Sequence, residues 1–157
     1  MKFSFLFILF VISNLEIPSL NQKVIIYVDS VIGKKVDRGE CWDLAAAALD
    51  HAGAYLDRSS QKNIYIFGKE INPKKENVFP GDIIQLENVK IEYTEGNGIY
   101  TESMAHHTAI IYEILGKDHY KIAHQNTSFS GKKVGVSELK MSYIKKGKVS
   151  VYRPYKK

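Results

Sequence analysis

The stretch Arg38–Leu49, RGECWDLAAAAL, holds the single cysteine of the 157-residue chain, Cys41. Alanine and leucine dominate the residues after this cysteine, and the sequence AGA follows a few residues later, at 52–54. This composition predicts a helix that begins at Cys41 and ends at the AGA sequence. The four consecutive alanines, 45–48, give the helix a slim face that another element can approach closely. We therefore expect this helix to lie centrally, packed against a sheet.

The position of Cys41 at a helix start, after Gly39, bears on its chemistry. First-turn amide N–H groups and the positive end of the helix dipole both stabilise a thiolate, which is the nucleophilic form of cysteine. The same N–H groups are suited to hold a developing oxyanion. One cysteine cannot form an intrachain disulfide. Cys41 is thus interpreted as a nucleophile, with a buried small hydrophobe or a cross-link between chains as the alternatives.

Length and composition indicate one ordinary globular domain. Hydrophobic residues make up 45% and charged residues 25% of the chain, and ten tyrosines against one tryptophan favour a fold that contains a sheet. The net charge of +5 suits an anionic cell wall, membrane surface or nucleic acid. No nucleic-acid-binding motif accompanies this charge, so we expect no nucleic-acid partner. We also expect a monomer without a cofactor.

The N-terminal sequence MKFSFLFILFVIS has one lysine followed by a solid apolar run, Phe3–Ile12. This pattern predicts a signal peptide, and the run is too short for a stable membrane-spanning helix. Val11 and Ser13 suit the −3 and −1 positions of a cleavage site before Asn14. A buried N-terminal strand or an uncleaved anchor is the alternative.

A signal peptide implies a secreted or periplasmic protein with no membrane span after cleavage. We assign residues 1–22 to the signal peptide and a short linker, and 23–157 to a single domain.

The order of predicted elements is helices first and then a run of antiparallel strands, which defines the α+β class. The sequence predicts helices at 23–33 and from Cys41, a short strand within 63–73, strands at 82–86, 90–94, 106–115, 119–127 and 148–154, a loop at 94–105, and a short helix after Ser137.

A cysteine nucleophile needs a base within hydrogen-bond reach, and the chain has five histidines. His51 lies ten residues along the helix from Cys41, which is about 15 Å by helical rise, and His119 falls in a turn. His106 and His107 begin a strand, and their side chains point to opposite faces. One of these two adjacent histidines is therefore the candidate base.

The next strand supplies a candidate group to orient that base. His124 and Asn126 lie on one of its faces, whereas Gln125 points the other way. If the two strands form a hairpin, His107 becomes a neighbour of the His124/Asn126 face. The same histidines also suit a zinc site, but no second thiol or clearly placed carboxylate accompanies them. We therefore assign no metal ligands.

Five blocks resemble known families in their order and spacing. SVIGKKVDRGECWDLAAAAL, FPGDIIQLENV, HHTAIIY, IAHQNT and VYRP are similar to the CHAP and NlpC/P60 amidase/peptidase families of the papain-like superfamily. The resemblance covers about residues 24–154. It is stronger still to the cysteine-proteinase-fold domain at the C-terminus of certain fungal myosin-binding actin-patch proteins, and secreted and bacterial stand-alone relatives share that pattern.

This resemblance implies a papain-like fold, with N-terminal helices and the nucleophile helix packed on a mostly antiparallel sheet. It assigns Cys41 as the nucleophile, His107 as the general base, and His124 and Asn126 as the polar residues that follow. A histidine in the third position is common in NlpC/P60 enzymes, whereas CHAP domains have an acidic residue there. The candidates for the oxyanion site and substrate cleft are Gly39, Trp42, Gln125 and His106.

Three functions compete at this point. The first is a secreted cysteine amidase or endopeptidase that hydrolyses amide bonds, with peptidoglycan peptides as the natural substrate of a bacterial protein. The second is a catalytically idle module of the same fold that binds a peptide or protein surface. The third is an acyltransferase or deamidase with the same cysteine chemistry.

Overall fold

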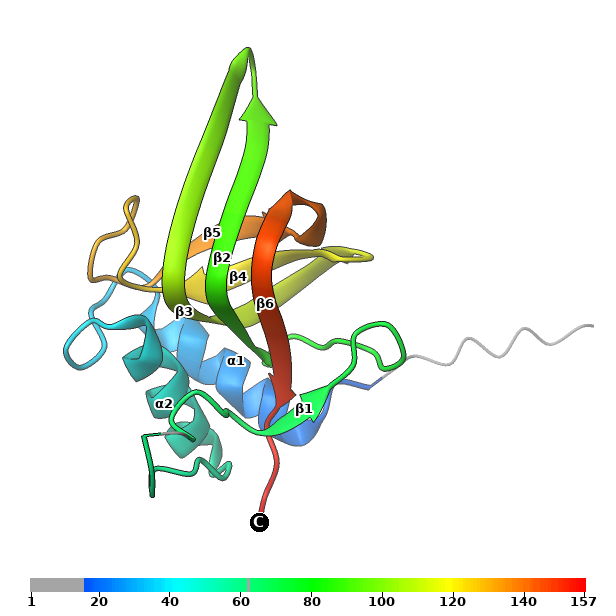
Figure 1. Cartoon of the computed structure of the whole chain (residues 1–157). Coiled ribbons are helices and arrows are strands. Elements are labelled where there is room, and N and C mark those ends of the chain that lie inside the picture. Colours follow the sequence, from blue (N-terminus) through cyan, green and yellow to red (C-terminus); the bar gives the residue numbers. More distant parts are fainter. Residues whose placement is uncertain (1–15, 62) are drawn as a thin grey trace, which may run out of the picture.

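A computed structural model of the chain describes residues 16–61 and 63–157. The predicted signal peptide lies outside the described residues. Two helices are followed by six strands, which confirms the α+β class and the papain-like architecture (Figure 1). Within the described ranges, no helix is long and apolar enough to cross a membrane. The elements are α1 (Ser19–Val31), α2 (Cys41–Ala52), β1 (Lys69–Ile71), β2 (Ile83–Glu95), β3 (Gly98–Gly116), β4 (His119–His124), β5 (Gly135–Lys140), a 3₁₀ turn (Met141–Tyr143) and β6 (Ile144–Arg153).

All strand pairs are antiparallel, and the strands form one sheet in the order β1-β6-β2-β3-β4-β5. The two helices pack on one face of this sheet. Their shared core includes Ile83, Ile110 and Ala123 from the sheet. A second core lies on the opposite face and includes Ile84, from β2, and Ile122, from β4. In the view of Figure 1, β4 and β5 run across β2 and β6, so the sheet is strongly twisted.

Helix α2 begins and ends as its sequence predicts. Asp43 closes its first turn, because its carboxylate accepts a 3.0 Å hydrogen bond from the backbone N–H of the N-cap residue Glu40. Gly53 ends the helix in a left-handed conformation with φ 68°. Ala45 and Ala48 are buried, so the slim face lies in the core, as expected.

Helix α1 begins four residues before the predicted domain start. Ser19–Gln22 form its first turn, and the side chain of Asn21 is fully buried. The Nδ2 atom of Asn21 donates hydrogen bonds to the carbonyl of Pro80 at 3.0 Å and to Asp82 at 2.8 Å. The predicted exclusion of residues 1–22 from the fold is therefore wrong at its C-terminal end. The polar Asn21 belongs to the domain because it anchors α1 to the start of β2.

Two predictions for the sheet are also wrong. The expected loop at 94–105 is part of a long hairpin, because β2 and β3 pair out to Glu95 and Gly98, with one interruption at Asn88, whose φ is 49°. The expected helix after Ser137 is the edge strand β5, whose pairing with β4 overrides the local helical signal. Figure 1 shows the far half of the β2–β3 hairpin rising beyond the rest of the sheet, and we call this part, residues 91–104, the arm.

Candidate active site

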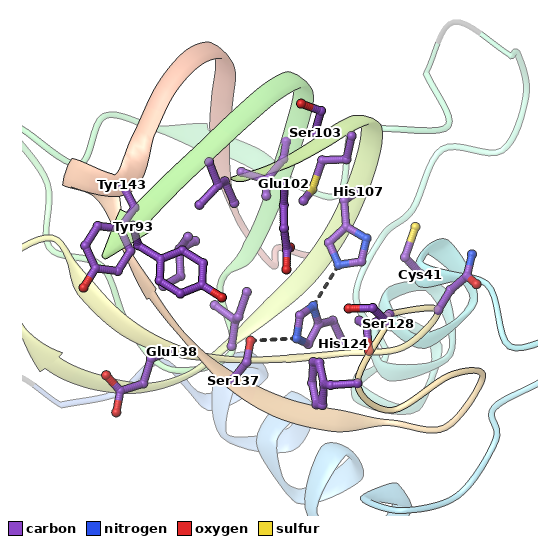
Figure 2. Close-up of a pocket in the computed structure, with 18 of the residues that line it drawn as sticks. Cys41, Tyr93, Glu102, Ser103, His107, His124, Ser128, Ser137, Glu138 and Tyr143 are labelled. Carbon is purple, nitrogen blue, oxygen red and sulfur yellow. Dashed lines mark hydrogen bonds between the residues drawn. The ribbon is translucent and has the colours of Figure 1, made fainter. Parts of the chain in front are cut away.

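A pocket of about 920 Å³ opens where the N-terminus of α2 meets the sheet. It is lined by residues from α2, β2, β3, β4 and β5 and from the loop after β4. Figure 2 shows Cys41, His107, His124 and Ser137 together in this pocket. The pocket thus brings the predicted nucleophile and the predicted base together from elements distant in the sequence.

Cys41 is the first residue of α2 and is half-buried and free. The first turn of a helix carries amide N–H groups that lack the usual intrahelical partner four residues back, and here the N–H of Asp43 bonds to the carbonyl of Glu40 at 3.0 Å. His107 comes from β3 and shares the pocket with Cys41. The Cys41 thiol makes no hydrogen bond to His107 within the described part of the chain. Cysteine–histidine pairs in unliganded sites are often longer than a hydrogen bond and close when substrate binds.

The two histidines of the pocket are joined to each other. The Nε2 atom of His107 lies 2.8 Å from the Nδ1 atom of His124. The Nε2 atom of His124 lies 2.9 Å from the hydroxyl of Ser137 on β5. These two hydrogen bonds, drawn as dashed lines in Figure 2, occupy the Nε2 atom of His107, and its Nδ1 atom makes no hydrogen bond within the described residues. The predicted neighbours His107 and His124 are thus bonded to each other.

Burial lowers the pKa of His107 to about 4. Burial, and then the charge of His107, lower the pKa of His124 to about 3. Both rings are neutral at pH 7, and in the tautomer whose Nε2–H donates to His124 the Nδ1 atom of His107 has a free lone pair. A neutral imidazole is the form that removes a proton from a thiol.

The loop after β4 is tied to the N-cap of α2. The Nε2 atom of Gln125 donates to the carbonyls of Val36, at 3.1 Å, and Glu40, at 2.8 Å. The amide of Asn126 donates to the Glu40 carboxylate at 2.7 Å, and Lys132 forms an ion pair with the same carboxylate. These contacts fix the helix start, and with it Cys41, relative to the strand that carries His124.

Asn126 lines the pocket, but it does not bond to either histidine in the described residues. Its φ of 63° interrupts the strand alternation, so it does not share a face with His124 as the sequence suggested. Its amide holds Glu40 instead. Of His124 and Asn126, it is His124 that bonds to His107.

Three of the four cleft candidates lie outside the pocket lining. Gly39 has φ 84°, and a Cβ atom there would lie 2.8 Å from the Cβ of Lys132, so glycine is required for the loop to approach. The indole N–H of Trp42 donates to the carbonyl of Ile64 at 2.6 Å, and Gln125 is buried in the loop contacts described above. These residues support the site from outside.

His106, the fourth candidate, does line the pocket. Its ring stacks on Tyr65, with centroids 4.7 Å apart and planes 4° apart. The other histidines are elsewhere: His51 packs on Tyr27, and the partly buried His119 pairs with Glu138 at 3.0 Å. No group of three histidine, cysteine, aspartate or glutamate side chains suited to a metal ion occurs in residues 16–61 and 63–157.

The sequence interpretation missed Ser137 and Phe129. The sequence places Ser137 at a helix start, whereas in the β4–β5 pair it lies opposite Ile122, two residues from His124, and its hydroxyl reaches the His124 ring. Phe129 packs over His124 with ring centroids 5.4 Å apart, although its loop has no periodic pattern. If 135–140 had been assigned as a strand, the proximity of Ser137 to His124 could have been predicted.

A cysteine at the start of a central helix, beside a histidine pair on an antiparallel sheet, defines a papain-like cysteine-proteinase fold. The sequence model of one family with this fold, the AIM3/BBC1 cysteine proteinase-fold domain, matches residues 19–157. The chain belongs to this family. The match begins at the first residue of α1, which agrees with the domain start seen in the structure.

Among solved structures, the chain is similar to that of Ly7917. The crystal structure of Ly7917 with the hydrolyzing product of MDP has a TM-score of 0.48 and 20% identity, over 85% of this chain and 63% of that chain. A second crystal structure of Ly7917 has a TM-score of 0.48 and 21% identity, over 84% and 62%. The aligned region thus spans about three-fifths of Ly7917. Curated protein sequences gave no match.

Proposed function

We propose that this protein is a cysteine amidase or endopeptidase that hydrolyses amide bonds through Cys41 and His107. One observation carries the proposal: the Nε2 atom of His107 is held by His124 at 2.8 Å in the pocket that Cys41 lines. A partner that holds one nitrogen of a catalytic imidazole fixes the tautomer and the direction of the other nitrogen. Membership of a cysteine proteinase-fold family supports the same conclusion.

In the proposed reaction, the Nδ1 atom of His107 takes the thiol proton of Cys41, and Sγ attacks the carbonyl carbon of the scissile amide. The resulting oxyanion accepts hydrogen bonds from first-turn N–H groups of α2. His107 then gives its proton to the leaving nitrogen, the C–N bond breaks, and an amine departs. Water, deprotonated by His107, attacks the thioester and releases a carboxylate and the free thiol.

We propose peptidoglycan stem and cross-bridge peptides as the first substrates to test, and a site of action outside the cytoplasm. The N-terminal pattern MKFSFLFILFVIS and the net charge of +5 support both parts of this proposal. Release of the protein into the medium or periplasm, without residues 1–13, would support the second part. Recovery of the full chain from the cytoplasm would contradict it.

The test of hydrolysis compares wild type, Cys41→Ala and His107→Ala on peptidoglycan peptides and on a panel of capped peptides. Mass spectrometry follows new amine and carboxylate ends. We expect cleavage by wild type and a loss of at least a hundredfold in each variant. Transfer to an added amine, with no carboxylate product, would identify a transferase instead. Equal cleavage by wild type and Cys41→Ala, or binding of peptides without cleavage, would contradict the proposal.

A further inference from the structure

The arm has an unpaired backbone edge beside the pocket. Residues 98–107 of β3 pair with β2 on one side, whereas the pairing of β3 with β4 begins only at Ile110. Alternate N–H and C=O groups of this stretch therefore point away from β2 without a strand partner among the described residues. Figure 1 shows β3 on the outer side of the arm, with the loop after β4 as the nearest segment beyond its base.

This open edge leads directly to the proposed catalytic base. Glu102, Ser103, Met104 and His107 all line the pocket that Cys41 lines. At about 3.4 Å per residue, the edge from His107 to Ile99 is about 27 Å long, which is enough for seven or eight residues of an extended peptide. An open strand edge of this kind is a ready template for another strand.

The charge of the pocket points to one kind of peptide. The chain carries a net charge of +5. Among the described residues that line the pocket, however, there is no lysine, arginine or aspartate, and there are three glutamates, Glu95, Glu102 and Glu138. Glu138 pairs with His119, whereas Glu95 and Glu102 form no ion pair within the described residues. Figure 2 shows the side chain of Glu102 pointing into the pocket. The pocket therefore presents carboxylates without partners to a bound molecule.

Aromatic rings stand beside these carboxylates. Tyr93 and Tyr100 lie directly opposite each other on the arm, and their rings stack with centroids 5.4 Å apart. The ring of Tyr143 stacks on that of Tyr93, with centroids 5.6 Å apart. Burial, and then the charges of Glu102 and Glu95, raise the pKa of Tyr93, so the carboxylates act on this ring. Tyrosine faces next to carboxylates favour ammonium and guanidinium groups.

We propose that an extended peptide with basic side chains binds as an added strand along the open edge of β3, residues 99–107. Its backbone bonds to the edge, and a lysine or arginine side chain lies against Glu102 and Tyr93. The peptide bond next to His107 is then the one presented to Cys41. This inference rests on the proposed function and names the class of substrate that the same site takes.

The test uses the full chain with Cys41→Ala, so that binding is measured without turnover. The probes are two capped heptapeptides, Ala-Lys-Ala-Lys-Ala-Lys-Ala and the same peptide with glutamate in place of lysine. We expect the lysine peptide to bind at least tenfold more tightly. Glu102→Gln reduces this preference at least threefold, whereas Glu92→Gln, a control on the same hairpin outside the pocket lining, leaves it unchanged.

The strand mode is tested with N-methylated peptides, which leave the protein unaltered. An added strand bonds to the edge through every second residue. One of the two N-methylated series, on lysines or on alanines, therefore loses binding, whereas the other series still binds. In hydrogen exchange, the amides of 99–107 that exchange rapidly in the free protein become protected by the lysine peptide. Those already bonded to β2 do not change.

Several results would overturn the inference. One is equal affinity for the lysine and glutamate peptides. Another is an equal effect of Glu102→Gln and Glu92→Gln on the preference for the lysine peptide. A third is equal binding of the two N-methylated series. Protection of the edge that rises with protein concentration in the absence of peptide would assign it to a second copy of the chain. Basic peptides that bind without being cleaved would defeat the proposed function alone. Cleavage of acidic and basic peptides at equal rates would defeat this inference alone.

Discussion

The Nε2 atom of His107 and the Nδ1 atom of His124 lie 2.8 Å apart, so one proton is shared between two buried imidazoles. Burial lowers the pKa of both rings, to about 4 for His107 and about 3 for His124. Two neutral rings bond well, because one donates and the other accepts. Two charged rings would both donate and would repel each other, which makes the pair sensitive to acid.

Acid should therefore destabilise the protein through this pair. In the unfolded chain both rings titrate near 6.5, so between about pH 6.5 and pH 4 the unfolded state binds more protons than the folded state. The free energy of unfolding thus falls as pH falls through this window, by about 2 kcal/mol per ring at pH 4.5. Urea unfolding at pH 7 and pH 4.5 measures the loss.

His107→Gln and His124→Gln should each reduce this loss, whereas His119→Gln, at a partly exposed position outside the histidine pair, should leave it unchanged. An acid loss of the same size in all four proteins would show that the histidine pair does not titrate as described.

Ser137→Ala should weaken the orientation of the base. The substitution removes the 2.9 Å partner of the His124 Nε2 atom and leaves a buried polar atom unpaired, which costs about 1 to 2 kcal/mol of stability. It should also slow alkylation of Cys41 several-fold, and NMR of the His124 ring nitrogens should show a mixture of tautomers. Ser137→Thr should restore one tautomer.

Ser128→Ala, at another serine of the pocket lining, is the control for this substitution. An unchanged His124 tautomer in Ser137→Ala would contradict the positioning role of Ser137.

Gly39→Ala should destabilise the site more than a left-handed φ alone explains. The new Cβ atom would meet Lys132 at 2.8 Å, in the loop that holds the start of α2. Gly33→Ala is a matched control, because Gly33 has a similar φ of 78° and open space around it. We expect a cost of about 1 kcal/mol for Gly33→Ala and a larger cost for Gly39→Ala, with slower alkylation of Cys41 in the latter alone. Equal unfolding free energies for the two variants would contradict the close approach.

Asn21→Ala should test the N-terminal boundary of the domain. The side chain of Asn21 donates to buried Asp82, which also pairs with Arg153 at 2.8 Å. Loss of this donor should cost about 1 to 3 kcal/mol, because a buried carboxylate loses one of its hydrogen bonds. Gln22→Ala, at the exposed neighbour, should change the free energy of unfolding little. Equal effects of the two substitutions would show that Asn21 does not anchor α1.

The sequence was most informative where the local pattern and the tertiary structure agree. The alanine helix from Cys41 has its cap, its slim face and its glycine stop within the short segment 40–53, so its bounds were predicted closely. His107 and His124 could be paired because they lie on adjacent strands of a hairpin, where side-chain alternation and a tight turn fix their neighbours.

The predictions failed where long-range pairing decides the structure. The glycine-bearing segment 94–105 has the composition of a loop, but its partner strand holds it in the arm. Ser137 and Glu138 look like a helix start, whereas the unsatisfied edge of β4 recruits them into β5. The roles of Gln125 and Asn126 as ties to the N-cap of α2 depend on contacts more than 80 residues apart in sequence.

The central claim is that His107 acts as the base for Cys41, and the most direct measurement is the rate of Cys41 alkylation by iodoacetamide between pH 4 and pH 9. The proteins are wild type, His107→Ala and the control His119→Ala. We predict that, at pH 6, wild type and His119→Ala react at the same rate, and at least about tenfold faster than His107→Ala. Rates and pH profiles that coincide for wild type and His107→Ala would contradict the claim.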